Sequence, residues 1–391
     1  MRIAAVLILV ACGGPSVRRA PVTMAPEPAK PAPLAAPDAP GVTPASTSPA
    51  PAPTVEPAPA RAERIELTFM GDVMAGGTFS GRWVPQATEK HDPLEAISAQ
   101  VASDLAVANL ETPVVDKIPI ETLVTDLRFG ATPKQISWLP KHGITVVSLA
   151  NNHAADLGAQ GLSETPMHLA KLGITPIGAP RADGGPLVRV ETIEVKGWKI
   201  GFIAATEKLN RGQVKKVGLV PRLLQKELKD ALVPVVTEAR TNHDLVFVVL
   251  HWGRQFADAP DRWQVQAAHA FIDAGADGVI AHHPHIWQRV ERYKNGLIAY
   301  SLGNFVFQNS MPWQRLTGVL RLGFHRDKKC LDQVVIHPAA IYSSPVHHPK
   351  PVTGNLRKDI VERLTRLSGQ GPNPTKLVLE GDRLVAPGAC P

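Results

Sequence analysis

The feature that most constrains this chain is a series of apolar β-type segments, each of which ends in polar side chains. Beyond residue 64 these segments alternate with stretches of helical periodicity, which is typical of an α/β fold. Five of them are followed within two residues by Asp, Asn or His, and a sixth leads to Ser and Asn. The segments are 65–70, 105–108, 144–149, 244–250, 278–281 and 297–300. Because ligand sites gather at the carboxyl ends of strands, we expect one shared site there.

The side chains at and just beyond these strand ends are of the kinds that bind transition metals. The candidate ligands are two carboxylates, one amide and three imidazoles: Asp72, Glu111, Asn152, His251, His283 and His285. Carboxylates mixed with imidazoles suit Mn, Zn or Fe, whereas Ca and Mg prefer shells of oxygen alone. Six ligands exceed the needs of one catalytic zinc and fit two divalent ions about 3.5–4 Å apart. The sequence therefore predicts a centre of two metals.

Each motif taken alone also has a simpler explanation in local structure. Turns or caps account for Asp72, Glu111 and Asn152 as readily as a site does. The pair His251–Trp252 could pack together, with the indole in the core. The cluster 282–285 is harder to explain in this way, because three imidazoles follow a buried strand within four residues. We therefore take this cluster as the main signal for metal.

The first sixty-two residues have the composition of a targeting signal and a spacer. Residues 1–11 form a short basic start and an apolar stretch, and Cys12 follows in a sequence that resembles the lipobox of bacterial lipoproteins. Residues 12–62 are so rich in Pro and Ala that they cannot bury apolar surface, so we expect a disordered tether. Gly13 after the cysteine favours, by the same resemblance, the outer membrane. We thus expect a lipoprotein anchored through Cys12 on the periplasmic or outer cell surface.

Composition limits what the remaining residues, 63–391, can form. They are numerous enough for one large domain with a substantial core. No run of eighteen apolar residues exists, which excludes a spanning helix, and three cysteines exclude a disulfide scaffold. Cys330 and Cys390 could nevertheless pair in an oxidising compartment. The net charge of +7 is compatible with an anionic partner; we expect no nucleic acid.

The motifs occur in the order found in a known family. They are Gly71-Asp72-Val73-Met74, Asn109-Leu110-Glu111, 148–153, Asp156-Leu157-Gly158, His251-Trp252-Gly253, Ala276-Asp277, 282–285 and 300–307. Over about residues 65–307 the chain resembles the bacterial capsule-synthesis CapA family, also called the poly-γ-glutamate biosynthesis protein family. That family is similar to calcineurin-like metallophosphoesterases. The resemblance implies an α/β (α+β) fold of four layers, αββα, in which two mixed sheets pack face to face with helices outside.

The resemblance assigns the same six residues to the two ions. Asp72 is similar to the aspartate of the first strand that ligates one metal, and Glu111 takes the position of the bridging carboxylate. Asn152 resembles the metal-bound asparagine of this superfamily. The imidazole ligands of the later strands correspond to His251, His283 and His285.

The resemblance implies further roles around these ligands. His153 resembles the histidine that hydrogen-bonds the substrate and protonates the leaving group, so we expect it to be catalytic. Asn151, His282 and Asn304 are candidates for substrate contact, and His282 is also an alternative register for the last imidazole pair. One departure concerns Met74, which stands where a metallophosphatase has the histidine of Asp-x-His, so that one ligand is missing.

Two classes of function are open from the sequence. The resemblance implies an envelope lipoprotein that acts in the biosynthesis or export of capsule or poly-γ-glutamate, with the anionic polymer or the capsule-synthesis machinery as partner. The site chemistry favours a metal-dependent phosphoesterase or another hydrolase of an envelope substrate. Gln255 stands where the family often carries Glu, which weakens a general-base role at this position. A third hypothesis is therefore a non-catalytic envelope binding protein. Metal-dependent turnover distinguishes these.

Overall fold

The computed structural model describes residues 62–79, 82–86, 91–120, 128–181, 185–210, 219–308, 311–328, 330–344 and 346–387. The chain divides into two units, Met1–Glu56 and Pro57–Pro391, and every described residue belongs to the second. The expected signal peptide, Cys12 and all but the last residue of the expected tether therefore lie outside the described residues and stay predictions.

The larger sheet combines a parallel half with an antiparallel half. The parallel half consists of β1 (Arg64–Val73), β4 (Leu105–Leu110), β5 (Ile144–Ser148) and β6 (Thr175–Ile177). The antiparallel half continues from β1 through β14 (Leu316–His325), β15 (Cys330–Tyr342), β18 (Arg383–Ala386) and β17 (Val378–Glu380). Two short strands join it, β13 (Asn304–Val306) beside β1 and β16 (His348–Pro351) beside β15. A separate hairpin is formed by β2 (Gly76–Phe79) and β3 (Arg82–Pro85).

The smaller sheet has a parallel centre and antiparallel edges. Its centre consists of β8 (Trp198–Thr206), β9 (Leu245–His251), β10 (Gly278–His282) and β12 (Gly296–Ala299). Its edges are β7 (Val190–Val195) and β11 (Val290–Tyr293). Lys196 and Gly197, with φ of 49° and 72°, form the tight turn between β7 and β8, since such two-residue turns need positive φ at both positions.

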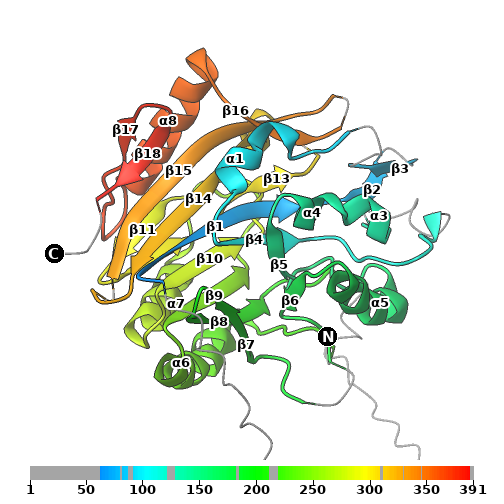
Figure 1. The fold of residues 1–391 in the computed structure, drawn as a ribbon, viewed down its shortest axis with the longest axis horizontal. Coiled ribbons are helices and arrows are strands. Elements are labelled where there is room, and N and C mark those ends of the chain that lie inside the picture. The colour runs from blue at the N-terminus through cyan, green and yellow to red at the C-terminus, as the bar shows by residue number, and fades with distance from the viewer. Residues whose placement is uncertain are drawn as a thin grey trace, which may run out of the picture. The chain divides into compact units, whose positions relative to one another are not determined.

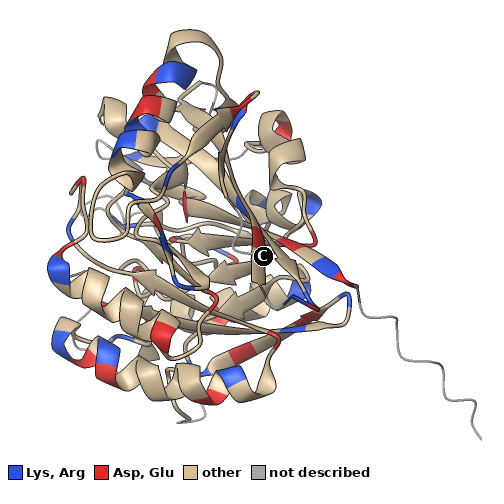
Figure 2. Cartoon of the chain, turned by 90° about the vertical axis from the view of Figure 1, so that its left-hand side faces the viewer, with Lys and Arg blue, Asp and Glu red and all other residues tan. Residues whose placement is uncertain are grey.

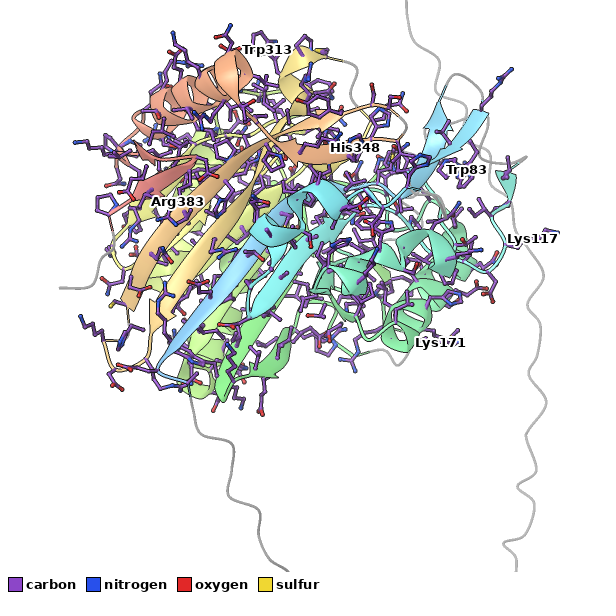
Figure 3. All side chains as sticks on the ribbon, turned by 45° about the horizontal axis from the view of Figure 1, so that its top comes forward. Trp83, Lys117, Lys171, Trp313, His348 and Arg383 are labelled. Atoms are coloured by element: carbon purple, nitrogen blue, oxygen red, sulfur yellow. The ribbon has the colours of Figure 1, made fainter. Side chains whose placement is uncertain are left out.

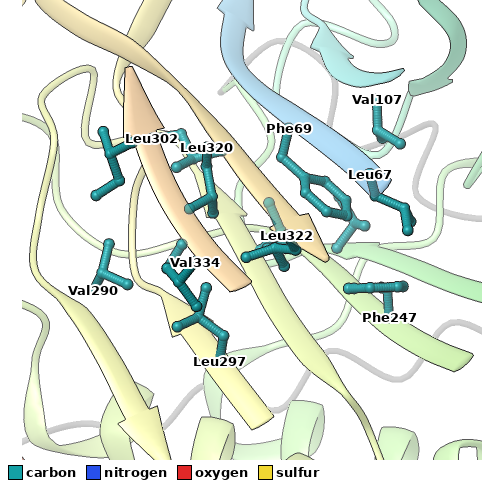
Figure 4. Close-up of a cluster of buried hydrophobic side chains, with 14 of the residues drawn as sticks. Leu67, Phe69, Val107, Phe247, Val290, Leu297, Leu302, Leu320, Leu322 and Val334 are labelled. Carbon is teal, nitrogen blue, oxygen red and sulfur yellow. The ribbon is translucent and has the colours of Figure 1, made fainter. Parts of the chain in front are cut away.

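The two sheets pack face to face through every second residue of their strands. On β9, Leu245, Phe247 and Val249 join the core between the sheets, whereas the intervening residues face the helices. The Phe247 ring lies 5.1 Å from that of Phe69 on β1, and Figure 4 shows these two side chains facing each other between the sheets. It also lies 5.8 Å from the ring of Phe324 on β14. Aromatic contacts thus hold the larger sheet against the smaller one.

Helices cover the outer faces of both sheets (Figure 1). On the smaller sheet lie α6 (Gln225–Asn242) and α7 (Arg262–Asp273). On the larger sheet lie η1 (Glu95–Ile97), α1 (Ser98–Val101), α3 (Pro133–Ile136), α4 (Trp138–Lys141) and α5 (Gly158–Lys171). The remaining helix, α8 (Gly354–Ser368), contacts both β15 and β11, and η3 (Pro312–Arg315) precedes β14. The expected α/β sandwich of two mixed sheets flanked by helices is confirmed.

The charged residues of these helices face solvent. Figure 2 shows Lys and Arg interspersed with Asp and Glu along them. No helix among the described residues is both long and apolar enough to cross a membrane.

The sequence of residues 93–103 predicts one continuous helix, and this prediction is wrong in length. The structure has only the 3₁₀ turn η1 followed by one turn of α1. The hydroxyl of Thr68 on β1 donates a hydrogen bond of 2.8 Å to the carbonyl of Val101, and Ala102 leaves the helical region with ψ of 122°. The sheet thus binds a carbonyl that a longer helix would use itself.

Cys330, the first residue of β15, is disulfide-bonded. Cys390 lies outside the described residues, so its pairing with Cys330 stays a prediction. The register of the last strands favours this pairing. Val334 of β15 lies opposite Ala386 of β18, and the two strands are antiparallel. Cys330 lies four residues before Val334 and Cys390 four residues after Ala386, so the same register continued would bring the cysteines opposite each other.

Truncation of Phe247 tests the aromatic contact between the sheets. We expect Phe247→Ala to lower the free energy of unfolding by about 3–5 kcal/mol, because the ring is fully buried and its loss leaves a cavity. Denaturant unfolding of the full chain measures this from the midpoint at an unchanged slope. The control is Trp313→Ala, since this side chain is 59% exposed at the periphery (Figure 3) and should matter by about 0.5 kcal/mol or less. Equal effects of both substitutions would contradict the assignment.

Candidate metal centre

The site lies where the carboxyl ends of strands from both sheets meet. In the larger sheet, Asp72 on β1 is in register with Asn109 on β4 and with Asn304 on β13. In the smaller sheet, His251 on β9 is in register with His282 on β10. All five side chains are buried. The strand ends that stand out in the sequence therefore converge, as expected for this class of sheet.

Two glycines shape the end of β1. The ladder between β1 and β4 is irregular between Phe69 and Asp72, and Gly71 lies in this gap. A Cβ atom at Gly71 would lie 2.0 Å from the carbonyl oxygen of Gly303, so no other residue fits. Gly303 itself has φ of 61°, and its carbonyl accepts a hydrogen bond of 2.8 Å from the backbone N–H of Asp72. This close approach fixes the backbone from which the Asp72 carboxylate projects.

One group of candidate ligands gathers around Asp72. Ligand atoms of Asp72, Glu111 and His285 all lie within 4.8 Å of one another. His285 Nδ1 is 3.2 Å from Asp72 Oδ2, and Asn109 Nδ2 donates a hydrogen bond of 2.8 Å to Asp72 Oδ1. Both carboxylates are fully buried.

A second group gathers around His251. Its Nε2 atom lies 2.7 Å from Asn152 Oδ1, 3.1 Å from His283 Nδ1 and 3.3 Å from Glu111 Oε1. In one neutral tautomer of each ring, both of these imidazole nitrogens carry a lone pair, so all four atoms can then act as metal ligands. Glu111 belongs to both groups, which is the position expected of a bridging ligand.

The hydrogen bonding shows whether cations fit this cavity. Both carboxylate oxygens of Glu111, Oδ2 of Asp72 and Nδ1 of His282 are buried and make no hydrogen bond to any described residue. A buried carboxylate without donors is strongly destabilising unless a positive charge compensates it. The mixed oxygen and nitrogen donors are those that Mn, Fe or Zn prefer. The residues present therefore fit a pair of divalent ions that share Glu111.

Two of the imidazoles have their lone pairs available. Burial lowers the pKa of His251 well below its usual range, and positive neighbours add to this effect. Burial likewise lowers the pKa of His283, as does the nearby His251. Both rings are consequently neutral at physiological pH, which is the form that binds metal.

Other groups in the centre hold protons in the metal-free protein. Burial, together with the negative charge of Asp72, raises the pKa of Glu111 to about 7. For His285, burial acts to lower the pKa, but the negative charges of Glu111 and Asp72 outweigh it and raise the pKa to about 9. Metal binding must displace these protons.

His153 is held by a carboxylate beside the centre. Its Nδ1 atom donates a hydrogen bond of 2.6 Å to Asp156 Oδ2, and its ring stacks on Phe129 at 3.8 Å. The backbone N–H of Phe129 donates to the same Asp156 oxygen at 2.7 Å. Burial lowers the pKa of His153, but the charge and hydrogen bond of Asp156 outweigh burial and raise it. Asp156 belongs to the motif Asp156-Leu157-Gly158, but the sequence alone predicted no role for it.

Several asparagines orient the ligands. Asn151 Nδ2 donates to Asn109 Oδ1 at 3.2 Å and to the Leu110 carbonyl at 2.9 Å, while Asn151 Oδ1 accepts from the backbone of His153. Asn304 Oδ1 lies 2.9 Å from His285 Nδ1. Both side chains are fully buried and hydrogen-bond to candidate ligands or to their neighbours. The expected substrate contact of Asn151 and Asn304 stays a prediction.

Two orienting residues were missed in the sequence. Asn109 was quoted only as part of a motif, and Asn210, whose Oδ1 accepts a hydrogen bond of 2.9 Å from Asn152, belonged to none. Nothing in local sequence marks an asparagine as the partner of a distant ligand.

Comparison with known proteins identifies the family. Residues 66–309 match the family model described as "Bacterial capsule synthesis protein PGA_cap". The chain belongs to this family. The PGA biosynthesis protein CapA of Bacillus subtilis (strain 168) is 29% identical over 309 residues, covering 77% of this chain and 78% of that protein. The capsule biosynthesis protein CapA of Bacillus anthracis is 30% identical over 325 residues, covering 79% and 75%.

Solved structures overlap more weakly with this member of the capsule-synthesis family. A calcineurin-like phosphoesterase, YfkN from Bacillus subtilis, covers 76% of this chain and 97% of its own, at 12% identity and a TM-score of 0.36. A hypothetical protein from Thermus thermophilus covers 74% and 96%, at 16% identity and a TM-score of 0.39. These overlaps carry no argument about function.

The two departures noted in the sequence of this family member have different surroundings. Met74 is fully buried and packs with Phe129 and Phe307 in a small apolar cluster. Gln255 is exposed. The position two residues after Asp72 therefore serves packing and offers no ligand.

A second group of acidic and imidazole side chains lies outside this centre. His168 Nε2 on α5 is 3.5 Å from Asp116 Oδ1 and 3.7 Å from Glu164 Oε2. The Asp116 side chain is 81% exposed, so water solvates this carboxylate. We assign the group to the surface electrostatics of α5.

The protonation of the centre predicts how metal affinity depends on pH. In the metal-free protein the pKa values of Glu111 and His285 are about 7 and about 9, so protons must leave before an ion binds. We expect the affinity of the full chain for Mn²⁺ to rise as the pH increases from 6 to 9. Calorimetric titration in buffers of different ionisation enthalpy measures both the affinity and the protons released. An affinity that stays constant over this range would contradict the assignment.

Proposed function

We propose that this chain is a lipoprotein of the cell envelope that uses a centre of two divalent ions in the synthesis or export of an anionic capsule polymer. Its membership of the capsule-synthesis family supports the pathway. Two relatives carry the names PGA biosynthesis protein and capsule biosynthesis protein. The observation that carries the metal centre is the buried Glu111 carboxylate, which has no hydrogen-bond donor among the described residues and lies among imidazoles.

Each ion has its own set of ligands in this proposal. Asp72, Glu111 and His285 hold one ion, and Glu111, Asn152, His251 and His283 hold the other. A bound pair of this kind lowers the pKa of water and stabilises the charge that develops in a phosphoryl displacement. The surrounding asparagines fix the rings and amides, which keeps the donors in place before any ion arrives.

His153 supplies the proton in this mechanism. Because Nδ1 is bound to Asp156, the proton on Nε2 is the one that the ring can donate to a leaving group. The raised pKa keeps a larger fraction of the ring protonated near neutral pH. Stacking on Phe129 holds the ring plane, so His153 acts as a positioned general acid.

The geometry favours a hydrolase of phosphoester-like substrates over a purely structural centre. A structural metal site needs no positioned acid, whereas His153 is oriented by two separate contacts. The second candidate is an assembly protein that binds the polymer at the centre without turnover. It is favoured by Gln255, which lies exposed where the family often carries Glu.

Charge distribution bears on how an anionic polymer is recognised. On the face shown in Figure 2, Lys and Arg alternate with Asp and Glu along the described helices and strands. Recognition on that face would be weak, because interspersed charges cancel beyond about one Debye length. A carboxylate or phosphate of the polymer therefore finds its strongest attraction at the metal centre.

Metal-dependent turnover tests the hydrolase. We expect the full chain with Mn²⁺ to hydrolyse a nitrophenyl phosphate or the corresponding diester. Asp72→Asn and His251→Ala should lower the rate at least about 100-fold and reduce metal content. His153→Asn should lower it about 100- to 10,000-fold with metal content unchanged, because it removes only the acid.

The matched control for these variants is His269→Ala, which removes an imidazole on α7 that is bound to Glu291 outside the centre. It should leave the rate and the metal content unchanged. A protein that binds two ions, hydrolyses neither ester and retains polyglutamate would overturn the hydrolase in favour of the assembly role.

Lipid anchoring has its own test. We expect the mature protein to begin at Cys12 and to enter the detergent phase on phase separation, because several acyl chains hold a protein firmly in a membrane. Cys12→Ser should move it to the aqueous phase and remove the lipid mass from the amino-terminal peptide. The same partition for both proteins would rule out the anchor.

A further inference from the structure

His282 is a buried imidazole beside the centre that is not one of the six candidate ligands. It is 2% exposed, and its Nδ1 atom makes no hydrogen bond within the part of the chain that the structure describes. The same atom lies 3.2 Å from Asp72 Oδ1, so the carboxylate of Asp72 is its close polar neighbour. A buried ring nitrogen left in this state is costly unless another group uses it.

We propose that His282 is a ligand of the ion held by Asp72, Glu111 and His285. This inference rests on the two-metal centre of the proposed function and adds a residue to it. Donor atoms about 2.0–2.2 Å from one ion lie about 2.8–3.6 Å apart in tetrahedral geometry or as cis ligands in octahedral geometry. The distance from His282 Nδ1 to Asp72 Oδ1 falls in this range, as does the 3.2 Å from His285 Nδ1 to Asp72 Oδ2.

The backbone explains how three nearby imidazoles serve two ions. His282 is the last residue of β10, and its position in the ladder is fixed opposite His251. His283 and His285 then adopt φ of 98° and 58°, in the left-handed region that non-glycine residues rarely occupy. This turn sends His283 toward His251, at 3.1 Å, while His282 and His285 both lie against Asp72.

His282 also compensates for what β1 lacks. Met74 directly follows β1, two residues after Asp72, but it packs with Phe129 and Phe307 and offers no metal-binding nitrogen. With His282 included, each ion has four protein donors and Glu111 is shared. The ligand missing from the first strand is then supplied by β10, from the other sheet.

Metal stoichiometry tests this inference on the full chain. We expect the unaltered protein to bind two equivalents of Co²⁺, with the visible spectrum of both sites. His282→Ala should bind one equivalent at full affinity and the other at least about 100-fold more weakly, a larger loss than is usual for an outer-shell residue. The spectrum should lose intensity from one site only.

Asn109→Ala is the matched control. It too removes a nitrogen that contacts Asp72 Oδ1, at 2.8 Å, but that nitrogen belongs to an amide donor that binds no metal. This variant should retain two equivalents, with at most about 10- to 100-fold weaker affinity. Thermal unfolding of each protein in chelator shows whether the metal-free fold persists, and His282→Gln replaces His282→Ala if it does not.

The outcomes separate this inference from the proposed function. Two tight equivalents in both His282 variants would overturn the role of His282 and leave the two-metal centre intact. Absence of metal from the unaltered protein would overturn the centre itself. Equal losses in His282→Ala and Asn109→Ala would show that His282 only orients Asp72.

Discussion

The structure around the strand ends depends on one unsatisfied charge, the carboxylate of Glu111. It is fully buried, both of its oxygens lack a hydrogen-bond donor among the described residues, and Asp72, a second buried carboxylate, lies close by. Two negative charges in a buried cavity repel each other strongly. Burial and the charge of Asp72 raise the pKa of Glu111 to about 7, so near neutral pH a proton neutralises this carboxylate only part of the time. Divalent ions bound as proposed would remove this cost and would link binding energy to fold stability.

The fold provides this cavity because its two sheets end at the same place. Aromatic packing around Phe247 holds the sheets face to face. The parallel strands at the centre of each sheet then end side by side, at the same edge of the sandwich. Gly71 and Gly303 then let β1 approach a neighbouring loop more closely than any side chain permits. The core thus sets the position of the cavity, while local backbone geometry sets the direction of each ligand.

Sequence predicted the site better than it predicted the edges of the fold. Strand ends and motif order pointed to six residues that the structure does bring together, because a buried parallel strand fixes where its last residue lies; their role as ligands stays a prediction. The short strands β16 and β18 were missed, since their pairing depends on β15, far away in the chain. Asn109 and Asn210 were missed for a related reason: an asparagine that orients a distant ligand has the same local pattern as one in a turn. Contacts that only tertiary structure creates leave no local signal.

In the proposed centre, His282 takes the role of the ligand that is missing at Met74, which shows that the place of a donor atom in the fold matters more than its place in a sequence motif. A ligand is useful to an ion only through its donor atom, and β10 brings such an atom to Asp72 from the opposite sheet. Met74, directly after β1, packs its thioether against Phe129 and Phe307, whose rings also contact His153 and His285. The apolar cluster therefore supports the acid and one ligand at once, and it excludes water from their far side. Met74 therefore supports the centre by packing, while His282 on β10 supplies the donor atom that position 74 lacks in the proposed centre.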